Sequence, residues 1–159
     1  MAILRVVTMV NAPAARCFDL ARSVDLHVRS AGGTREAAIA GTMSGLLDLG
    51  DQVTWRGKHF GVWQTLTSKI TVFDRPRHFR DSQVDGAFAR LDHDHLFERA
   101  DDLTQMTDVF QYSAPLGPVG RMAELLFLNR YLTRFLCERG MTIKKVAESD
   151  DWKLYAPAA

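Results

Sequence analysis

Apolar and polar positions alternate in short runs through most of the chain and change to a helical period only near its end. Residues 2–10 form an apolar run, and Asn11 followed by Pro13 supplies a cap and a favoured first position for a short helix. The apolar spacing over 14–30 predicts one or two short helices, broken near Ser23. We therefore expect an N-terminal strand followed by two short helices.

The middle of the chain reads as a meander of antiparallel strands. Strand-like runs are separated there by Gly, Asp and Pro, with little sign of a long helix. The expected strands span residues 36–47, 51–59, 62–73, 77–85, 87–98 and 103–112.

A single long helix is predicted after the strands. The stretch SAPLGPVG at 113–120 breaks the sheet, and an apolar stripe of helical period follows over 119–147, with Gly140 as a candidate bend. A curved antiparallel sheet needs a cover for its concave face, and this helix is the one element long enough to provide it. The order predicts an α+β helix-grip fold of about six or seven strands, as one domain over 1–150 with a C-terminal tail at 151–159.

Composition narrows the class of partner. The chain has 159 residues, 47% of them hydrophobic and 25% charged, with a net charge of +1, which argues against disorder and against a nucleic-acid partner. No stretch approaches the ~20 apolar residues of a membrane span, so we expect no integral membrane association and a cytoplasmic location. Cys17 and Cys137 are then expected to be reduced.

Several motifs carry a resemblance to a known superfamily. They are the segment GDQVTWRGKHFGVWQTLTSKITVFDRPRHFRDSQ at 50–83, LDHDHLF at 91–97 and PLGP at 115–118. The chain resembles the START-like or SRPBCC (Bet v 1-like) superfamily, and within it a small bacterial branch of the polyketide cyclase/dehydrase type. The resemblance implies a cavity between sheet and long helix that holds an apolar or amphipathic molecule. It does not define the chemistry, because the superfamily includes binders, transporters, cyclases and regulators.

Strand parity assigns the histidines of DHDH to the cavity. Side chains alternate along a strand, so His93 and His95 share a face with apolar neighbours, whereas Asp92 and Asp94 point to water. Asp108 is the acidic member of an inward row on the next strand. A four-residue loop would place His93 opposite Asp108, and a shift of two residues would place His95 there instead.

Three functions are compatible with these residues. The first is binding of a small hydrophobic or amphipathic molecule, with a few polar anchors in an apolar cavity. The second is a cyclase or dehydratase-like enzyme in which His93 or His95 is the acid/base group and Asp108 orients it. The third is a metal site, because His-x-His places two imidazoles on one face and His59 with Asp108 would complete four ligands.

We expect binding without a cofactor or a metal. The Gly-containing segment 41–50 and the SAPLGPVG loop are candidate gates, and the apolar helix is a candidate homodimer face. The residues expected to line the ligand site are Trp55, His59, Gln64, Ser68, His93, His95, Met106, Asp108, Phe110, Tyr112, Met122 and Leu126.

Overall fold

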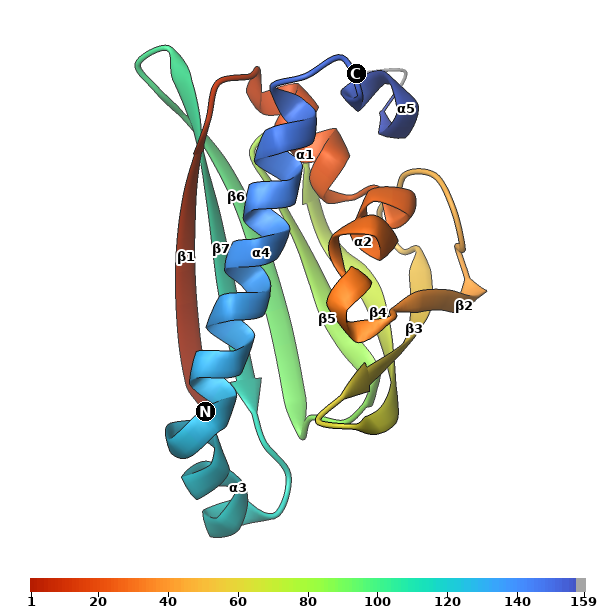
Figure 1. Ribbon diagram of the computed structural model, residues 1–159, viewed down its shortest axis with the longest axis vertical. Helices are drawn as coiled ribbons and strands as arrows, with labels where there is room; N and C mark the ends of the chain where they lie inside the picture. Colours follow the sequence, from red (N-terminus) through yellow and green to blue (C-terminus); the bar gives the residue numbers. More distant parts are fainter. Residues whose placement is uncertain (157–159) are drawn as a thin grey trace.

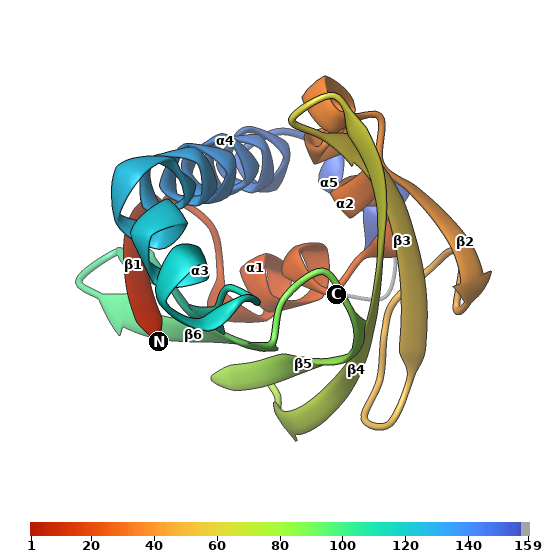
Figure 2. The ribbon, with the colours of Figure 1, turned by 90° about the horizontal axis from the view of Figure 1, so that it is seen from below.

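The computed structural model describes residues 1–156 and confirms the predicted α+β helix-grip fold. Seven antiparallel strands form one curved sheet in the order β1-β7-β6-β5-β4-β3-β2. The long C-terminal helix lies along its concave side (Figures 1 and 2). The strands are β1 (Ala2–Val10), β2 (Ala37–Gly41), β3 (Gln52–His59), β4 (Val62–Asp74), β5 (His78–Gly86), β6 (Arg90–Ala100) and β7 (Leu103–Ser113).

Short helices close one end of the sheet. Helix α1 (Ala14–Ala21) follows Pro13, and Ser23 caps α2 (Val24–Ser30) by accepting a hydrogen bond from the Leu26 amide at 3.3 Å. A short 3-10 turn, η1 (Gly32–Thr34), leads into β2. Both predicted helices and the break between them are therefore confirmed.

The prediction of a strand over 36–47 was wrong in its second half. Strand β2 ends at Gly41, where φ is +74° and an added Cβ would lie 2.2 Å from the Gln52 carbonyl oxygen. A glycine is therefore required at that turn. The chain then crosses as a loop to β3, with Leu47 buried in the core.

The C-terminal helix begins earlier than predicted and is not uniform. It runs as α3 (Gly117–Ala123), a π-helical segment η2 (Glu124–Leu128) and α4 (Asn129–Ala147). Along α4 the predicted stripe is buried, with Leu132, Leu136, Ile143 and Val146 each at most 9% exposed. Helix α4 continues unbroken through Gly140. An added Cβ there would lie 2.6 Å from Thr8 Oγ1, so Gly140 permits close contact between α4 and β1.

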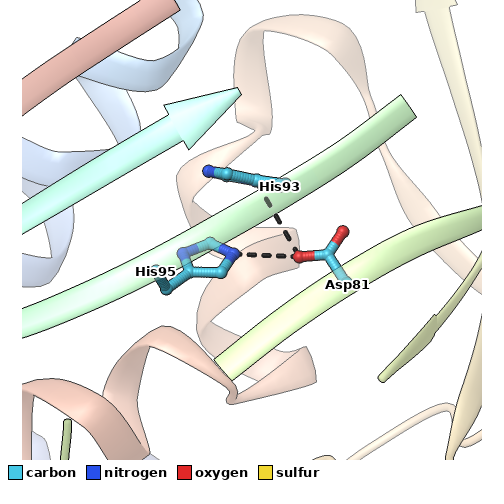
Figure 3. Close-up of side chains that lie close together, drawn as sticks. All are labelled: Asp81, His93 and His95. Atoms are coloured by element: carbon cyan, nitrogen blue, oxygen red, sulfur yellow. Dashed lines mark hydrogen bonds and ion pairs between the residues drawn. The ribbon is translucent and has the colours of Figure 1, made fainter. Parts of the chain in front are cut away.

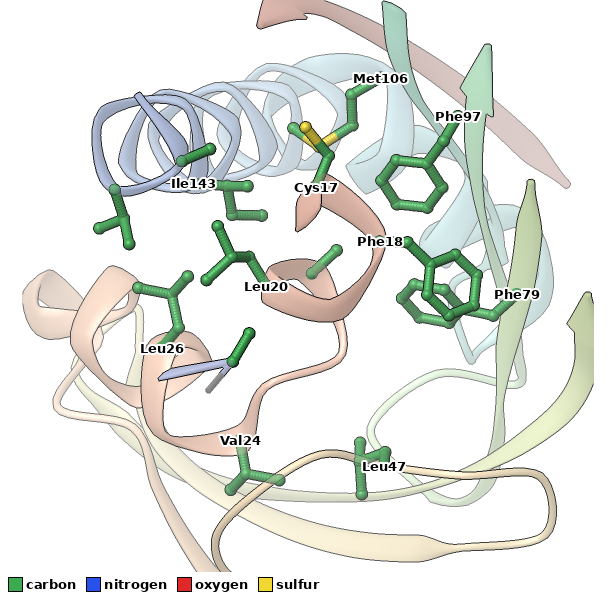
Figure 4. Close-up of a cluster of buried hydrophobic side chains, with 14 of the residues drawn as sticks. Cys17, Phe18, Leu20, Val24, Leu26, Leu47, Phe79, Phe97, Met106 and Ile143 are labelled. Atoms are coloured by element: carbon green, nitrogen blue, oxygen red, sulfur yellow. The ribbon is translucent and has the colours of Figure 1, made fainter. Parts of the chain in front are cut away.

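The main core lies where α1 meets the sheet. Phe18 packs edge-on against Phe73 and Phe79, with ring centroids 5.2 Å apart in both pairs. It also packs at a tilt against Phe97, and Figure 4 shows Phe18 beside Phe79 and Phe97. This aromatic cluster fixes α1 against β4, β5 and β6. The remaining space under the sheet extends from Phe79 toward the other end of α4.

The expected tail is partly structured. Helix α5 (Trp152–Tyr155) packs on the core, with the Arg16 guanidinium 4.3 Å from the Trp152 ring and Arg29 donating to the Tyr155 hydroxyl at 2.8 Å. Residues 157–159 of the expected tail lie outside the described residues. Over the described part of the chain, no helix is both long and apolar enough to cross a membrane.

Neither cysteine forms a disulfide within the described residues. Cys17 lies on the buried face of α1, and burial raises the pKa of its thiol to about 11. A thiol with so high a pKa is not nucleophilic near neutral pH. Cys137 lies exposed on α4.

Candidate functional site

A cavity of about 340 Å³ lies between the concave face of the sheet, α2 and the C-terminal helix. Such a volume is at the lower end of the range of small-molecule sites, about 300–1,000 Å³. Its lining is largely apolar and includes Leu66, Ile70, Phe79, Phe88, Leu91, Phe110, Leu132 and Leu136.

Half of the residues expected at the site line this cavity. They are Trp55, His59, Gln64, Ser68, His93 and Phe110. His95 and Asp108 are buried behind the lining, and Met106 belongs to the core around α1. Tyr112 is fully buried, and its hydroxyl donates to Asn129 Oδ1 at 2.9 Å.

Met122 and Leu126 correct the sequence-based expectation. They are 62% and 72% exposed, because the segment over α3 and η2 projects beyond the sheet and its apolar side chains face the surface. The helical spacing of the apolar residues shows that these side chains share one face of the helix. It does not show where the helix extends beyond the sheet.

Four residues form a buried histidine–aspartate cluster: Asp81 on β5, His93 and His95 on β6, and Asp108 on β7. Asp108 Oδ1 lies 2.8 Å from His93 Nε2 and 3.0 Å from His95 Nδ1. On the other side of the rings, Asp81 Oδ2 lies 2.9 Å from His95 Nε2 and 3.8 Å from His93 Nδ1 (Figure 3). The imidazoles are therefore held between two carboxylates.

The β6–β7 register explains this geometry. Ala100 pairs with Leu103, so the turn is Asp101-Asp102, two residues shorter than the four-residue loop considered from the sequence. His95 is consequently opposite Asp108, and His93 is opposite Phe110. His93 still reaches Asp108 diagonally across the ladder, so both histidines share one carboxylate.

Hydrogen bonding overrides burial at both carboxylates of this cluster. Burial would raise the pKa of Asp108, but the bonds to His93 and His95 hold it well below its usual range. The same competition, with His95 as hydrogen-bond partner, lowers the pKa of Asp81 to about 2. Both groups are therefore carboxylates near neutral pH.

The pKa values of the His93 and His95 imidazoles are shifted in opposite directions. Burial and then the charge of His95 lower the pKa of His93, and the bond to Asp108 does not compensate. Burial also disfavours the charged form of His95, but its hydrogen bonds to Asp108 and Asp81 prevail and raise its pKa. Of the two, His95 is thus the more readily protonated.

A second polar cluster, here called the Glu36 cluster, consists of His27, Glu36, His59 and Tyr131. Glu36 Oε2 lies 2.8 Å from His27 Nε2 and its Oε1 lies 3.3 Å from His59 Nε2. His59 Nδ1 is in turn 2.8 Å from the Tyr131 hydroxyl. All four residues line the cavity.

Glu36 is ionised in this arrangement. Burial acts to raise its pKa, but the hydrogen bonds to His27 and His59 lower it to about 2. Burial lowers the pKa of His27, and the bond to Glu36 only partly opposes that effect. The His27 ring also stacks on Trp55, with centroids 4.0 Å apart.

Arg139 adds a positive charge to the lining. It is 9% exposed, and its Nη2 donates to the Ala21 carbonyl at 2.8 Å. Its charge lowers the pKa of both His27 and Asp81, which belong to different clusters. The guanidinium therefore lies near both polar clusters, and a guanidinium carries more donors than this one bond uses.

Among the lining residues that sequence reasoning missed are four charged or titratable ones: His27, Glu36, Asp81 and Arg139. Two of these four residues could have been identified from the sequence pattern. Asp81 shares strand parity with buried Phe79, and Arg139 falls at helical spacing between Leu136 and Ile143. Glu36 could not be identified in this way, since it precedes β2 and meets its partners only in the folded chain.

The aspartates of DHDH lie on the outer face, as predicted, and do not bond to the neighbouring histidines. Asp94 is nevertheless 6% exposed rather than solvated. Arg80 and His78 cover it, with Arg80 Nε 2.8 Å and His78 Nε2 2.7 Å from Asp94 Oδ1. Asp92 accepts from Ser82 at 2.7 Å.

The predicted four-ligand metal set does not assemble. His59 belongs to the Glu36 cluster, and Asp108 contacts the ring nitrogens that face away from Asp81. Asp81, His93 and His95 instead offer three ligand atoms within 4.8 Å of one another.

Comparison with solved structures shows the fold. A protein of Thermus thermophilus, TTHA0849, matches with a TM-score of 0.72 at 12% identity, covering 92% of this chain and 99% of that one. A START superfamily protein from Mycobacterium smegmatis gives 0.68 at 10% identity, over 92% and 97% of the two chains. Ginseng major latex-like protein 151 from Panax ginseng gives 0.65 at 12%, over 93% and 98%.

The predicted START-like, Bet v 1-like fold is therefore confirmed. No protein-family model matches the chain. No curated protein matches it either.

Proposed function

We propose that this protein binds a small amphipathic molecule in the cavity between the sheet and the C-terminal helix. The observation that carries the proposal is the cavity itself, about 340 Å³ of space that the side chains leave unfilled. A core that served stability alone would be packed to crystal-like density. The fold also supports the proposal, because the chain is similar in structure to a START superfamily protein over 92% of its length.

The lining indicates an amphipathic rather than a purely apolar ligand. Apolar side chains such as Leu66, Leu91 and Phe110 supply most of the wall, while Arg139 and the Glu36 cluster reach it from other elements. Burying polar groups without partners is costly, so a ligand with its own oxygen or nitrogen atoms is favoured over a hydrocarbon. Arg139 favours an acceptor, such as a carboxylate, carbonyl or hydroxyl oxygen.

Binding is better supported than acid–base catalysis by His93, His95 and Asp108. Of these three, only His93 lines the cavity, and the Asp108 carboxylate is 4% exposed behind it. Two of the three groups therefore act through their neighbours and do not touch a molecule in the cavity.

Filling the cavity tests the proposal. Ser68 lines it and is 4% exposed, so Ser68→Phe should occupy the space, whereas Thr71→Phe on the same strand places the same side chain on the exposed outer face. The probe is 8-anilinonaphthalene-1-sulfonate, an amphipathic anion whose fluorescence rises in apolar surroundings. We expect saturable binding by the wild type and Thr71→Phe, and at least tenfold weaker binding by Ser68→Phe.

Native mass spectrometry then identifies what the protein carries. A retained small molecule, present in the wild type and in Thr71→Phe but absent from Ser68→Phe, would support the proposal. Equal probe binding by all three folded proteins would show that the probe does not enter the cavity and would contradict it. Near-ultraviolet circular dichroism establishes that each variant is folded.

A further inference from the structure

We propose that Asp81, His93 and His95 form a binding site for a divalent transition-metal ion, with Asp108 as the carboxylate that orients both imidazoles. The site does not depend on the ligand-binding function proposed above. Its argument rests on which ring nitrogens each carboxylate contacts, on the distances among the three ligand atoms, and on the position of the cluster at the cavity wall.

Asp108 determines which nitrogens are free to act as ligands. Its Oδ1 lies 2.8 Å from His93 Nε2 and 3.0 Å from His95 Nδ1, so each of these nitrogens is placed to donate a proton to it. In the neutral form of each ring, the remaining nitrogens, His93 Nδ1 and His95 Nε2, then carry the lone pairs. Metal-bound histidines characteristically donate their second N–H to such a carboxylate, which fixes the ring and raises its basicity.

Both lone pairs lie on the side of Asp81. Asp81 Oδ2 is 2.9 Å from His95 Nε2 and 3.8 Å from His93 Nδ1 (Figure 3). Two electron-rich atoms 2.9 Å apart repel each other unless a cation lies between them. A proton between Asp81 and a ring would remove this repulsion for one of the two nitrogens. A metal ion bound by Asp81 would remove it for both nitrogens at once.

The distances suit one ion. Two ligand atoms that are each ~2.1 Å from a metal lie no more than ~4.2 Å apart. Both contacts of Asp81 Oδ2 fall within this limit. All three ligand atoms lie within 4.8 Å of one another, so binding one ion requires the two imidazole nitrogens to approach each other by at most about 0.6 Å. Two imidazoles and one carboxylate are a donor set suited to zinc, iron, cobalt or nickel rather than to calcium or magnesium.

The surroundings favour a cation and leave the site accessible. Asp81 and Asp108 carry two negative charges and the nearby Arg139 one positive charge, which leaves a net charge of −1 that attracts a divalent ion. His93 and Asp81 line the cavity, whereas His95 is 2% exposed and closes the inner side. Stacking of the His95 ring on Phe79, with centroids 4.1 Å apart, holds it in place. An open coordination position would therefore face the cavity, where water or an oxygen atom of a bound molecule completes the shell.

The test uses cobalt(II) and zinc(II) with the untagged, chelator-treated protein. We expect one equivalent of cobalt(II) to bind, to produce visible absorption bands, and to be displaced by zinc(II). Asp81→Asn and His95→Gln should each weaken binding at least a hundredfold. Asp108→Asn, which alters only the orienting carboxylate, should weaken it ten- to a hundredfold. His78→Gln removes a histidine on the outer face of the sheet and should leave the metal affinity unchanged.

Proton NMR of the cobalt(II) protein gives a readout that does not depend on variants. Two coordinated imidazoles whose N–H groups bond to Asp108 should give two paramagnetically shifted signals in water that disappear in D₂O. Lack of stoichiometric cobalt(II) or zinc(II) binding by the folded wild type would overturn the proposal and leave a proton as the cation. Binding that survives Asp81→Asn and His95→Gln unchanged would also overturn it.

A failed metal titration leaves the ligand-binding proposal testable. The sulfonate probe is titrated into the same metal-free protein, and its saturable binding does not require the ion. Loss of metal binding with retained probe binding would therefore reject the metal site alone.

Discussion

The two polar clusters of the cavity are built in opposite ways. The histidine–aspartate cluster comes from three neighbouring strands, β5, β6 and β7, and the ladder between them fixes its geometry. The Glu36 cluster joins α2, the residue before β2, the end of β3 and α4, and its His59–Tyr131 contact spans 72 positions of sequence. Only the Glu36 cluster depends on how the C-terminal helix packs against the sheet.

The histidines of the two clusters also differ in burial. The side chains of His93 and His95 are 5% and 2% exposed, whereas those of His27 and His59 are 17% and 22% exposed. Among the carboxylates, Asp108 is 6%, Glu36 9% and Asp81, at the cavity surface, 21% exposed. Hydrogen bonds in a drier site are stronger and cost more to break. We infer that the first cluster is a rigid part of the sheet, and that the second is the part of the cavity able to adjust when a molecule binds.

The largest expected effect is that of Asp108→Asn on stability. The substitution keeps the shape but removes the charge that both imidazoles share, so we expect the free energy of unfolding of the metal-free protein to fall by about 3 kcal/mol. Urea denaturation measures it. Asp94→Asn is the matched control, because Asp94 also bonds to a histidine, His78, but on the outer face and with partly exposed partners. Its cost should be about 1 kcal/mol; equal losses would refute the difference between the clusters.

Glu36→Gln should cost less, about 2 kcal/mol, because an amide keeps part of the hydrogen bonding to His27 and His59 in a wetter site. The same urea experiment measures this change. A loss larger than that of Asp108→Asn would reverse the proposed order of rigidity.

Acidification should remove the contribution of Glu36 over a defined pH range. Its folded-state pKa is about 2 and its ordinary value is 4.5, so its carboxylate stabilises the fold fully above about pH 5 and progressively less as pH falls toward 2. The charged and titratable groups around it are His27 on α2, His59 on β3, and Tyr131 and Arg139 on α4. The difference in unfolding free energy between wild type and Glu36→Gln should therefore shrink between about pH 5 and pH 2. A difference that stays constant through this range would show that Glu36 is not ionised by its partners.

Tyr131→Phe should have the smallest effect on stability and a larger one on binding. It removes one hydrogen bond to a partly exposed histidine, which is worth about 1 kcal/mol or less. Because the His59 ring then keeps only its contact with Glu36, we expect it to be less firmly held and the affinity for the sulfonate probe to change several-fold. Unchanged affinity would show that the Glu36 cluster does not contact the bound molecule.

The histidine–aspartate cluster was largely predictable because strand parity is strict. Alternation along β6 and β7 was enough to bring His93, His95 and Asp108 to one face before their register was known. The register itself depended on a turn two residues tighter than the one assumed, which left Asp108 shared rather than assigned to one ring.

The Glu36 cluster was not predictable in this way. Only His59 was expected to face inward, and neither periodicity nor spacing relates residue 36 to residues 27, 59 and 131. Their meeting follows from the docking of α2 and α4 on the sheet, which is a property of tertiary packing. The exposed apolar residues of 117–128 show the same limit, since a stripe defines a face but not what covers it.

Gly140 has a consequence for how this protein could diverge. A Cβ added at Gly140 would lie 2.6 Å from Thr8 Oγ1, so a larger side chain at position 140 requires a smaller one at position 8. We therefore expect covariation between them among natural homologues: wherever position 140 gains a methyl group, position 8 should shrink to alanine or glycine. The cavity-lining residues of α4, such as Leu132 and Leu136, are not bound by this constraint, so we expect the lining to vary while the contact between helix and first strand stays unchanged.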